Sequence, residues 1–388
     1  MRFLWEGKLY QFAALPFGLA SAPRLFTKLM KPVVAILRSI GVRLLIYLDD
    51  IILFNQCPNQ LLVDMNSLVF LLRNLGLVVN DNKSIMTPVT QIEYLGMTID
   101  SVKMELALPS AKVQAIIAQC RELRAQKTVT IQALARIIGT LTSTVQAILP
   151  APLYYRHMQL LRTKALARIS SYATKIDLDQ GSRTELTWWI DHLKQWNGRS
   201  LISPGPDMVI QTDASKKGWG AYREGPVNAQ RFNGLWSMQE SKLQINLLEL
   251  RAAEFAVKAL SRERLNLHIH LKMDNVSALT HINKMGGARS RELIDATKSL
   301  WEYCLTRNIT LTAEFLPGVR NTEADKLSRE FNDSSNRKLS PGVFKQLVRK
   351  WGQIDLDLFA DRLNAQTRRY YSWKPDPLAA GMDAFLME

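Results

Sequence analysis

The alternation of apolar and polar residues predicts a helix followed by a hairpin in the first part of the chain. Residues 42–54 (VRLLIYLDDIILF) hold two apolar runs of β-favouring residues on either side of Asp49 and Asp50. This is the pattern of a hairpin with two acids at its tip. An apolar, helix-like segment begins at about Arg24, and Ser21 stands where its N-cap is expected.

Residues 106–175 show the period of helices. Apolar residues recur at three- and four-residue spacing through Val113, Ile116, Ile117 and Cys120. A second apolar stretch runs from Ile131 to Leu141, and Thr130 before it is a candidate N-cap. This part of the chain is therefore predicted to be mainly helical.

Beyond residue 205, strands and helices alternate, and four segments each carry one acid. MVIQTDAS and LHIHLKMDN are strand patterns that end near Asp213 and Asp274. INLLELRAAEFAVKAL is an amphipathic helix that carries Glu249, and NTEADKLSR predicts a short helix with Asp325 near its start. With GWGAYR as the second strand, the predicted order is strand, strand, strand, helix, strand, helix.

Turn-forming residues mark two linkers, at 197–207 (NGRSLISPGPD) and 332–341 (NDSSNRKLSP). They divide the chain into a block to about 200, a block to about 332 and a short tail. The length of 388 residues is enough for two or three domains of ordinary size. The predicted fold class is α/β in several domains.

The charge of the chain is strongly positive and unevenly distributed. Fifty Lys and Arg face 35 Asp and Glu, for a formal net charge of +15. Residues 106–175 hold ten basic residues against one acid, Glu122. Scattered charge usually forms a solvated face, but ordinary surfaces mix both signs. We therefore favour a surface that follows a phosphate backbone, although net charge alone also allows an acidic membrane as partner.

Cysteines and apolar segments exclude other classes of protein. Cys57, Cys120 and Cys304 form no CxxC pair, so neither a disulfide framework nor a zinc ribbon is predicted. The longest apolar stretch, residues 33–54, is interrupted by four charged residues, which excludes a simple membrane span. The first residues lack the apolar run of a signal peptide. We expect an intracellular protein, nuclear or cytoplasmic and not secreted.

Asp49 and Asp50 alone are weak evidence of a site, because Asp is common in β-turns. Two neighbouring carboxylates in an apolar hairpin repel each other and need cations to offset that repulsion. Their surroundings are more specific. LPFGLASAP (residues 15–23) lies upstream, and the downstream residues are Gly76-Leu77, Asn80, Lys83 and Tyr94-Leu95-Gly96.

In order and spacing these motifs resemble the palm of reverse transcriptases: FGL-x-S-A-P, then Y-x-D-D, a lysine-bearing motif and the YLG of the primer grip. The resemblance implies that Asp49 and Asp50 bind catalytic metal ions. It implies that Lys83 donates a proton to the leaving pyrophosphate; the alternative is that Lys83 is an ordinary surface lysine. It also implies contacts with template, primer or nucleotide at Gly18, Ser21, Tyr47, Tyr94 and Gly96.

One feature of this family has no counterpart in the chain. Polymerase chemistry uses two metal ions held by acids from two strands. The family's other aspartate precedes the FGL motif, and Glu6 is the only acid before Asp49 in this sequence. The fingers of the family also have no counterpart. We therefore expect no DNA synthesis by this chain alone.

The four acids after residue 205 form a second candidate site. Strand ends and helix starts that meet at one sheet edge would bring them together, and four such carboxylates cannot all stay ionised without metal. The set suits two Mg²⁺ ions, which activate a water and stabilise the leaving 3′-oxygen in phosphodiester cleavage. Each acid alone is explained more simply as a cap or an exposed residue, but the ordered set is hard to explain by chance.

Residues 205–332 resemble a ribonuclease H domain. Glu254 competes for the glutamate role, but Glu249 has the family-like E-L-x-A context. The loop LPGVRN lacks the histidine that some relatives carry before the last helix. The resemblance implies hydrolysis of the RNA strand of RNA–DNA hybrids, with the RNA recognised by its 2′-hydroxyls. It implies a metal-binding, catalytic set at Asp213, Glu249, Asp274 and Asp325.

Residues 341–388 are similar to the segment after ribonuclease H in DIRS-type retrotransposons, which leads into a region like phage adenine-N6 methyltransferases. IDLDLFAD would then hold the methyl donor. The motif that receives the target amine is absent, so we expect no methylation. A structural tail packed on the ribonuclease domain is the simpler interpretation of Asp355, Asp357 and Asp361.

These resemblances indicate an interior part of a retroelement polyprotein, most like the DIRS type. They predict four parts in order along the chain. These are a partial palm (1–105), a basic helical thumb and connection (106–204), a ribonuclease H domain with a mixed sheet (205–332) and a methylase-like segment (333–388). The implied cofactors are two Mg²⁺ or Mn²⁺ ions per active site, and the implied partner is an RNA–DNA hybrid or another nucleic-acid duplex. Two alternatives stay open: a non-catalytic nucleic-acid-binding remnant, or an active reverse transcriptase if a longer product supplies the missing aspartate.

Overall fold

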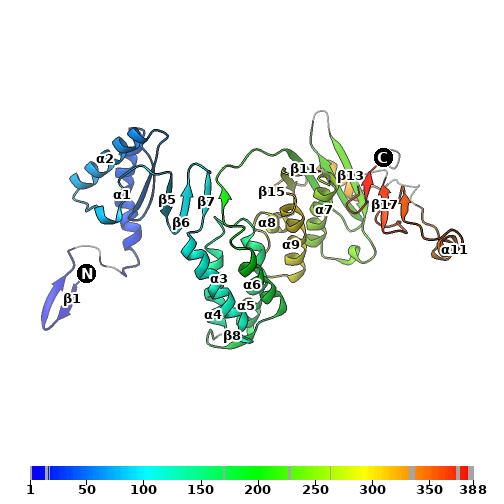
Figure 1. Cartoon of the computed structure of the whole chain (residues 1–388), viewed down its shortest axis with the longest axis horizontal. Helices are drawn as coiled ribbons and strands as arrows, with labels where there is room; N and C mark the ends of the chain where they lie inside the picture. Colours follow the sequence, from blue (N-terminus) through cyan, green and yellow to red (C-terminus); the bar gives the residue numbers. More distant parts are fainter. Residues whose placement is uncertain are drawn as a thin grey trace. The chain divides into compact units, whose positions relative to one another are not determined.

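The computed structural model describes residues 2–382 except 14, 15, 17, 169, 170, 226–228, 263, 332–336 and 373–375. The chain forms two compact units, Met1–Pro109 and Ser110–Glu388, which Figure 1 colours from blue to red along the sequence. The boundary predicted at residue 105 lies close to this division. The boundary predicted at 332 falls outside the described residues. No described helix is both long enough and apolar enough to cross a bilayer.

The first unit contains the predicted helix and hairpin. Its elements are β1 (Arg2–Trp5), β2 (Lys8–Gln11), α1 (Ala22–Ser39), β3 (Arg43–Tyr47), β4 (Asp50–Phe54), α2 (Pro58–Asn74), the 3₁₀ turn η1 (Asp81–Lys83), β5 (Gln91–Tyr94), β6 (Met97–Asp100) and β7 (Glu105–Ala107). Leu37 of α1, Leu44 of β3 and Leu68 of α2 lie in one buried cluster. Both helices therefore pack on the β3–β4 hairpin, and burial of their apolar stripes stabilises it.

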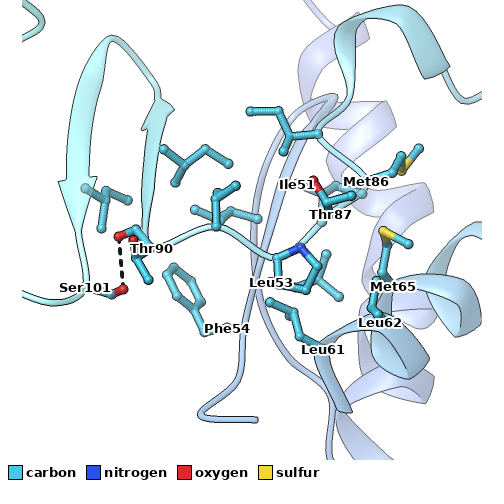
Figure 2. A pocket seen from close by; sticks show the side chains of 16 residues that line it. Ile51, Leu53, Phe54, Leu61, Leu62, Met65, Met86, Thr87, Thr90 and Ser101 are labelled. Atoms are coloured by element: carbon cyan, nitrogen blue, oxygen red, sulfur yellow. Dashed lines mark hydrogen bonds between the residues drawn. The ribbon is translucent and has the colours of Figure 1, made fainter. Parts of the chain in front are cut away.

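An apolar pocket of about 130 Å³ lies beside this hairpin (Figure 2). Strand β4 supplies Ile51, Leu53 and Phe54, while Leu61, Leu62 and Met65 come from α2. The other wall is formed by residues 85–90, where the Ser101 hydroxyl donates to the Thr90 carbonyl at 3.0 Å. This apolar contact places the segment that leads into β5 against the hairpin.

The second unit begins with the predicted helices. Its first elements are α3 (Ser110–Ala125), β8 (Thr128–Thr130), α4 (Ile131–Thr142), the 3₁₀ turn η2 (Ala151–Tyr154), α5 (Arg156–Arg168), β9 (Lys175–Asp177), α6 (Gln180–His192) and β10 (Arg199–Ser200). The four apolar residues that recur at helical spacing in α3 are buried, namely Val113, Ile116, Ile117 and Cys120. Thr130 caps α4 as predicted, because its hydroxyl accepts the Ala133 N–H at 3.1 Å.

A five-stranded mixed sheet follows, and its mixed character agrees with the predicted fold class. The predicted order of elements lacked two helices and one strand, which the structure places at residues 276–283, 291–305 and 310–315. Its strands run in the order β13-β12-β11-β14-β15. β11 pairs antiparallel with β12 and parallel with β14. The elements of this part are β11 (Met208–Ala214), β12 (Gly218–Arg223), β13 (Gln230–Leu235), η3 (Glu240–Lys242), α7 (Ile245–Leu260), β14 (His268–Met273), α8 (Val276–Asn283), α9 (Arg291–Leu305), β15 (Thr310–Phe315) and α10 (Thr322–Arg329).

Helices cover both faces of this sheet near β12. The buried Trp219 ring packs edge-on against Phe255 of α7, with ring centroids 5.7 Å apart. Gly220 points to the opposite face, because successive residues of a strand alternate. A Cβ on Gly220 would lie 2.4 Å from the Ala324 carbonyl oxygen of α10. Only glycine therefore lets α10 lie directly on β12, while α7, α8 and α9 lie together beside the sheet (Figure 1).

A buried carboxylate on α6 holds the start of α5, and two residues at that start join the helical part to the sheet part. Glu185 of α6 is fully buried, and its carboxylate accepts the N–H groups of His157 and Met158 at 2.7 and 3.0 Å. These N–H groups belong to the first turn of α5 and have no partner within the helix. Beside them the Arg156 guanidinium donates to the Lys284 carbonyl at the end of α8, and His157 Nε2 lies 3.2 Å from Asp295 of α9.

The tail packs on the sheet part, in agreement with its simpler interpretation. It consists of α11 (Pro341–Trp351) and the parallel strands β16 (Leu356–Leu358), β17 (Arg369–Ser372) and β18 (Gly381–Met382). Asp357 accepts the Gln366 N–H at 2.9 Å, so this carboxylate closes its own loop. Arg362 docks the tail, because its guanidinium lies 2.8 Å from Glu240 Oε2 and also donates to the Leu235 carbonyl.

Replacing Arg362 by Met should destabilise the second unit by about 2 kcal/mol, because it leaves the Glu240 carboxylate largely buried without its main partner. The two side chains are only 8% and 13% exposed. Arg251 remains 3.4 Å from Glu240 and limits the loss. Urea unfolding would measure it. The matched control is Arg368→Met, which removes an exposed arginine from the same segment. Equal effects of the two changes would contradict the docking role.

Candidate active site

Three of the predicted acids meet at one end of the mixed sheet. Asp213 lies near the end of β11, Asp274 directly follows the neighbouring parallel strand β14, and Glu249 lies in the second turn of α7. One carboxylate oxygen from each lies within 4.8 Å of the others. Among the described residues, these three acids are the one group of at least three His, Cys, Asp or Glu side chains with that spacing.

The electrostatics of this group favour a bound cation. Burial raises the pKa of Glu249 to about 9, and repulsion by Asp213 and Asp274 adds to the shift. Burial also raises the pKa of Asp213, against the hydrogen bond from Ser328. Glu249 Oε2 is buried and has no hydrogen-bond partner among the described residues. An orphaned carboxylate oxygen among repelling acids fits a divalent cation, which would relieve both penalties.

Helix α10 brings the fourth predicted acid nearby. Asp325 contributes to the raised pKa of Asp213, after burial and Asp274. Its own carboxylate is turned to Arg329, with Oδ1 2.7 Å from the guanidinium, and it is not part of the three-acid group. Ser328 of the same helix donates to Asp213 Oδ2 at 2.6 Å. The structure thus places Asp325 beside the group but pairs it with an internal cation.

Two residues that sequence reasoning missed hold α10 in place. Asn321 is fully buried, and its Nδ2 donates to the Thr212 carbonyl next to Asp213 at 2.9 Å. Ser328 lies one turn after Asp325 on the same short helix. Its i+3 position could have predicted that its hydroxyl lies on the same face as Asp325. The role of Asn321 could not be predicted from its neighbours in sequence, because its partner Thr212 is 109 residues away.

The fold gives Glu249 and Glu254 different surroundings. Glu254 lies in the contact between α7 and α9, where it accepts from Lys258 at 2.6 Å and from Ser299 at 2.9 Å. It is therefore a structural residue, and the three-acid group contains Glu249. The loop without a histidine also approaches the group, since a Cβ on Gly318 would lie 3.0 Å from Asp274 Oδ2.

The hairpin in the first unit places its acids as predicted. Tyr47 pairs with Asp50, so Leu48 and Asp49 form the two-residue turn and Leu48 takes a positive φ of 53°. The Tyr94 hydroxyl donates to the Asp50 carbonyl at 3.2 Å. Burial, followed by the charge of Asp50, raises the pKa of Tyr94. The structure thus brings the predicted primer-grip tyrosine to the acidic tip.

The YLG motif forms the next tight turn. Tyr94 pairs with Met97, and Leu95 and Gly96 take φ values of 51° and 70°. A two-residue hairpin turn with positive φ at both positions favours glycine at its second position. The role of Gly96 seen in the structure is therefore to turn the chain directly after Tyr94.

The remaining residues predicted for the first unit are more dispersed. Ser21 precedes α1, but its hydroxyl makes no capping hydrogen bond, so that part of the prediction is wrong. Its backbone is already helical, at φ −85° and ψ −14°, whereas a capping residue is normally extended. Gly18 takes a φ of 84° in the preceding loop, whose residues 15 and 17 are outside the described ranges. Lys83 lies exposed on η1, and no interaction among the described residues joins it to Asp49.

Comparison with protein families finds a match in the first unit. The family described as "Reverse transcriptase (RNA-dependent DNA polymerase)" matches residues 2–99. Two viral polyproteins match most of the chain. Polyprotein P3 of Commelina yellow mottle virus is 24% identical over 85% of this chain, and the enzymatic polyprotein of figwort mosaic virus (strain DxS) is 23% identical over 83%. The chain spans 17% and 46% of the lengths of these two proteins.

Solved structures match at low identity. The foamy viral protease–reverse transcriptase in complex with RNA/DNA hybrid is 17% identical and covers 88% of this chain and 43% of its own, with a TM-score of 0.44. LC11-RNase H1 in complex with RNA/DNA hybrid is 16% identical and covers 31% of this chain and 93% of its own, with a TM-score of 0.28.

Proposed function

We propose that this chain is part of a reverse transcriptase polyprotein whose second unit acts as a ribonuclease H on the RNA strand of RNA–DNA hybrids. The observation that carries the proposal is the group of Asp213, Glu249 and Asp274, with an orphaned oxygen on Glu249 and Asp325 on the adjoining helix. When bound by these four acids, two Mg²⁺ or Mn²⁺ ions would supply a water of lowered pKa and stabilise the leaving 3′-oxygen.

The chain's own side chains prepare this site. Ser328 donates to Asp213 Oδ2, so a hydroxyl of α10 holds one oxygen of that carboxylate in place. Burial of Asp213 and Glu249 keeps water from screening their charge. Gly220 and Asn321 fix α10 on β11 and β12, and so fix the distance of Ser328 from Asp213. Such fixed supporting contacts are what a preorganised site requires.

A nucleic-acid duplex is the proposed partner. Seven of the ten basic residues between 106 and 175 are exposed, namely Arg121, Arg124, Lys127, Arg136, Lys164, Arg168 and Lys175. Arg156 is not available, because it closes the end of α8. The foamy viral protease–reverse transcriptase and LC11-RNase H1 are each in complex with RNA/DNA hybrid in their structures. Exposed basic residues with one acid among them suit the regular phosphates of such a duplex.

Binding of a hybrid should fall steeply with salt. If about four of the exposed basic residues contact phosphates, a plot of log K against log salt has a slope of about −3.6. Lys127→Gln, directly before β8, combined with Lys175→Gln at the start of the paired strand β9, should reduce that slope by about 2. Fluorescence anisotropy with Ca²⁺ in place of Mg²⁺ would measure it. Lys345→Gln with Arg349→Gln on α11 is the control of equal charge, and a flat salt response would contradict the basic surface.

The experiment that tests the proposal compares three duplexes and one single strand. The full chain is incubated with RNA–DNA hybrid, double-stranded RNA, double-stranded DNA and single-stranded RNA, each labelled at one end. We expect cleavage of the RNA of the hybrid with Mg²⁺ or Mn²⁺ and none after EDTA. If a folded protein cleaves no hybrid, the proposal is wrong and a binding module without turnover remains. Equal cleavage of all four substrates would indicate another nuclease.

A narrower proposal concerns the first unit. The match to the reverse transcriptase family and the contact of Tyr94 with Asp50 favour a polymerase-derived palm. We propose that it binds the primer end without extending it, because Asp49 and Asp50 lie on one hairpin and the metals of polymerases need acids from two strands. Extension of a labelled primer with all four dNTPs would overturn this. Within reverse transcriptases we propose the DIRS type, on the sequence of the tail.

A further inference from the structure

Arg329 is an internal cation at the edge of the three-acid group. It ends α10, and its Nε and Nη2 both lie 2.7 Å from Asp325 Oδ1. The two side chains are 61% and 44% exposed, so water surrounds this ion pair. Arg329 also interacts electrostatically with Asp213 and Asp274. Burial raises the pKa of Glu249, and the Arg329 charge acts in the opposite direction.

This arrangement makes the four acids unequal. Asp213, Glu249 and Asp274 share one position where a cation would contact an oxygen from each. A second cation that used Asp325 together with Asp213 would have to displace the guanidinium from Asp325 or bind beside its positive charge. Both routes weaken binding, because like charges a few ångströms apart repel. The pair with Arg329 is itself weak, since exposed ion pairs contribute little.

Arginine also matches a second kind of partner at this place. The guanidinium is planar and always charged, and it binds carboxylate and phosphate with the same forked geometry. A duplex phosphate that reaches the three-acid group would pass close to the exposed Arg329. Exchange of Asp325 for that phosphate keeps the guanidinium paired and leaves the Asp325 carboxylate without its partner.

We propose that Arg329 is a positioning residue that holds Asp325 away from a second cation until a substrate phosphate takes the guanidinium. This inference rests on the proposed ribonuclease function and adds an order to it. The first cation binds the three-acid group in the free protein. The second binds tightly only together with the duplex, so Asp325 becomes available when substrate is present.

The test is a titration of the full chain with Mn²⁺ in the absence of nucleic acid, followed by electron paramagnetic resonance of the free ion. The parent should bind one Mn²⁺ tightly and a second weakly. Arg329→Gln should tighten the second binding constant about tenfold, because it removes the competing charge. Arg329→Lys keeps that charge and should restore most of the parent behaviour.

Lys326→Gln is the matched control. Lys326 lies on the same helix, is 68% exposed and lies 3.9 Å from Glu330 at i+4, so its replacement removes the same charge from another exposed i,i+4 pair. It should leave both Mn²⁺ constants unchanged. In a second measurement with Ca²⁺, Arg329→Gln should weaken hybrid binding several-fold more than Lys326→Gln does.

The outcomes separate this inference from the proposed function. If the parent binds Mn²⁺ and cleaves hybrid but Arg329→Gln titrates like the parent or like Lys326→Gln, the inference is wrong and the ribonuclease proposal stands. If the parent binds no Mn²⁺, both are wrong. If Arg329→Gln binds the second ion tightly and binds hybrid weakly, Arg329 links substrate to the second cation.

Discussion

Replacing Asp274 by Asn should abolish cleavage of an RNA–DNA hybrid, with a loss of at least about a hundredfold. The loss of a group that only orients a metal ligand costs about 10- to 100-fold, so the loss of a ligand should cost more. Asp274 supplies one of the three oxygens that lie within 4.8 Å of one another. Asn keeps the size of the side chain but brings no negative charge to the cation.

The measurement is the initial rate of cleavage of a labelled hybrid at saturating Mg²⁺. Asp191→Asn on α6 is the control, because it removes an exposed acid of the same kind elsewhere in the unit. The Asp274 variant should be at least as stable as the parent without metal, since one source of repulsion on Glu249 is gone. A stable Asp274→Asn protein with parental activity would refute the assignment of this group as the active site.

The second unit should lose stability as the pH rises from about 4.5 to about 8, and Glu185 should account for much of the loss. Burial raises the pKa of Glu185 from 4.5 to about 8, although the N–H groups of His157 and Met158 lower it. Between these values the folded protein keeps a proton that the unfolded chain has released. The stabilisation is therefore complete below the unfolded pKa and is lost as the pH approaches 8, by roughly 3 to 5 kcal/mol.

Urea unfolding between pH 5 and pH 8.5 would measure this loss. Glu185→Gln should flatten the profile, because the amide has no titrating proton while its oxygen can still accept an N–H at the start of α5. Glu249 and Asp213 also have raised pKa values, so the informative quantity is the difference between parent and variant at each pH. The exposed Glu122→Gln is the control. Parallel profiles for parent and Glu185→Gln would contradict the role of this carboxylate.

Local patterns predicted the elements that carry the candidate sites. The β3–β4 hairpin follows from two β-favouring runs, and its two-residue turn puts Asp49 and Asp50 at the tip. Thr130 caps α4 as expected from its position before an apolar run. Asp213 and Asp274 are predicted to lie close together because each stands at the end of a strand. The structure agrees, since β11 and β14 are neighbouring parallel strands whose ends share a sheet edge.

The choice between Glu249 and Glu254 shows where sequence reasoning reached its limit. Both lie on α7, five residues apart, and both are buried. Helix periodicity alone could not say which side chain faces the strand ends and which faces α9. Packing decided it, since Glu254 meets Lys258 and Ser299 while Glu249 meets Asp213 and Asp274.

The sequence by itself therefore determined the α/β class, the strand ends that carry Asp213 and Asp274 and the helix that carries Glu249, because these follow from residue periods. The predicted order of elements was incomplete, since it lacked α8, α9 and β15. Only the tertiary structure decided the supporting contacts. Asn321 meets Thr212, Ser328 meets Asp213, and Arg362 meets Glu240 across 109, 115 and 122 residues of chain. The partners in these contacts have no local pattern, since they depend on which faces of distant elements pack together. Gly220 shows the physical reason most directly: a missing side chain in β12 decides how closely α10 approaches Asp213.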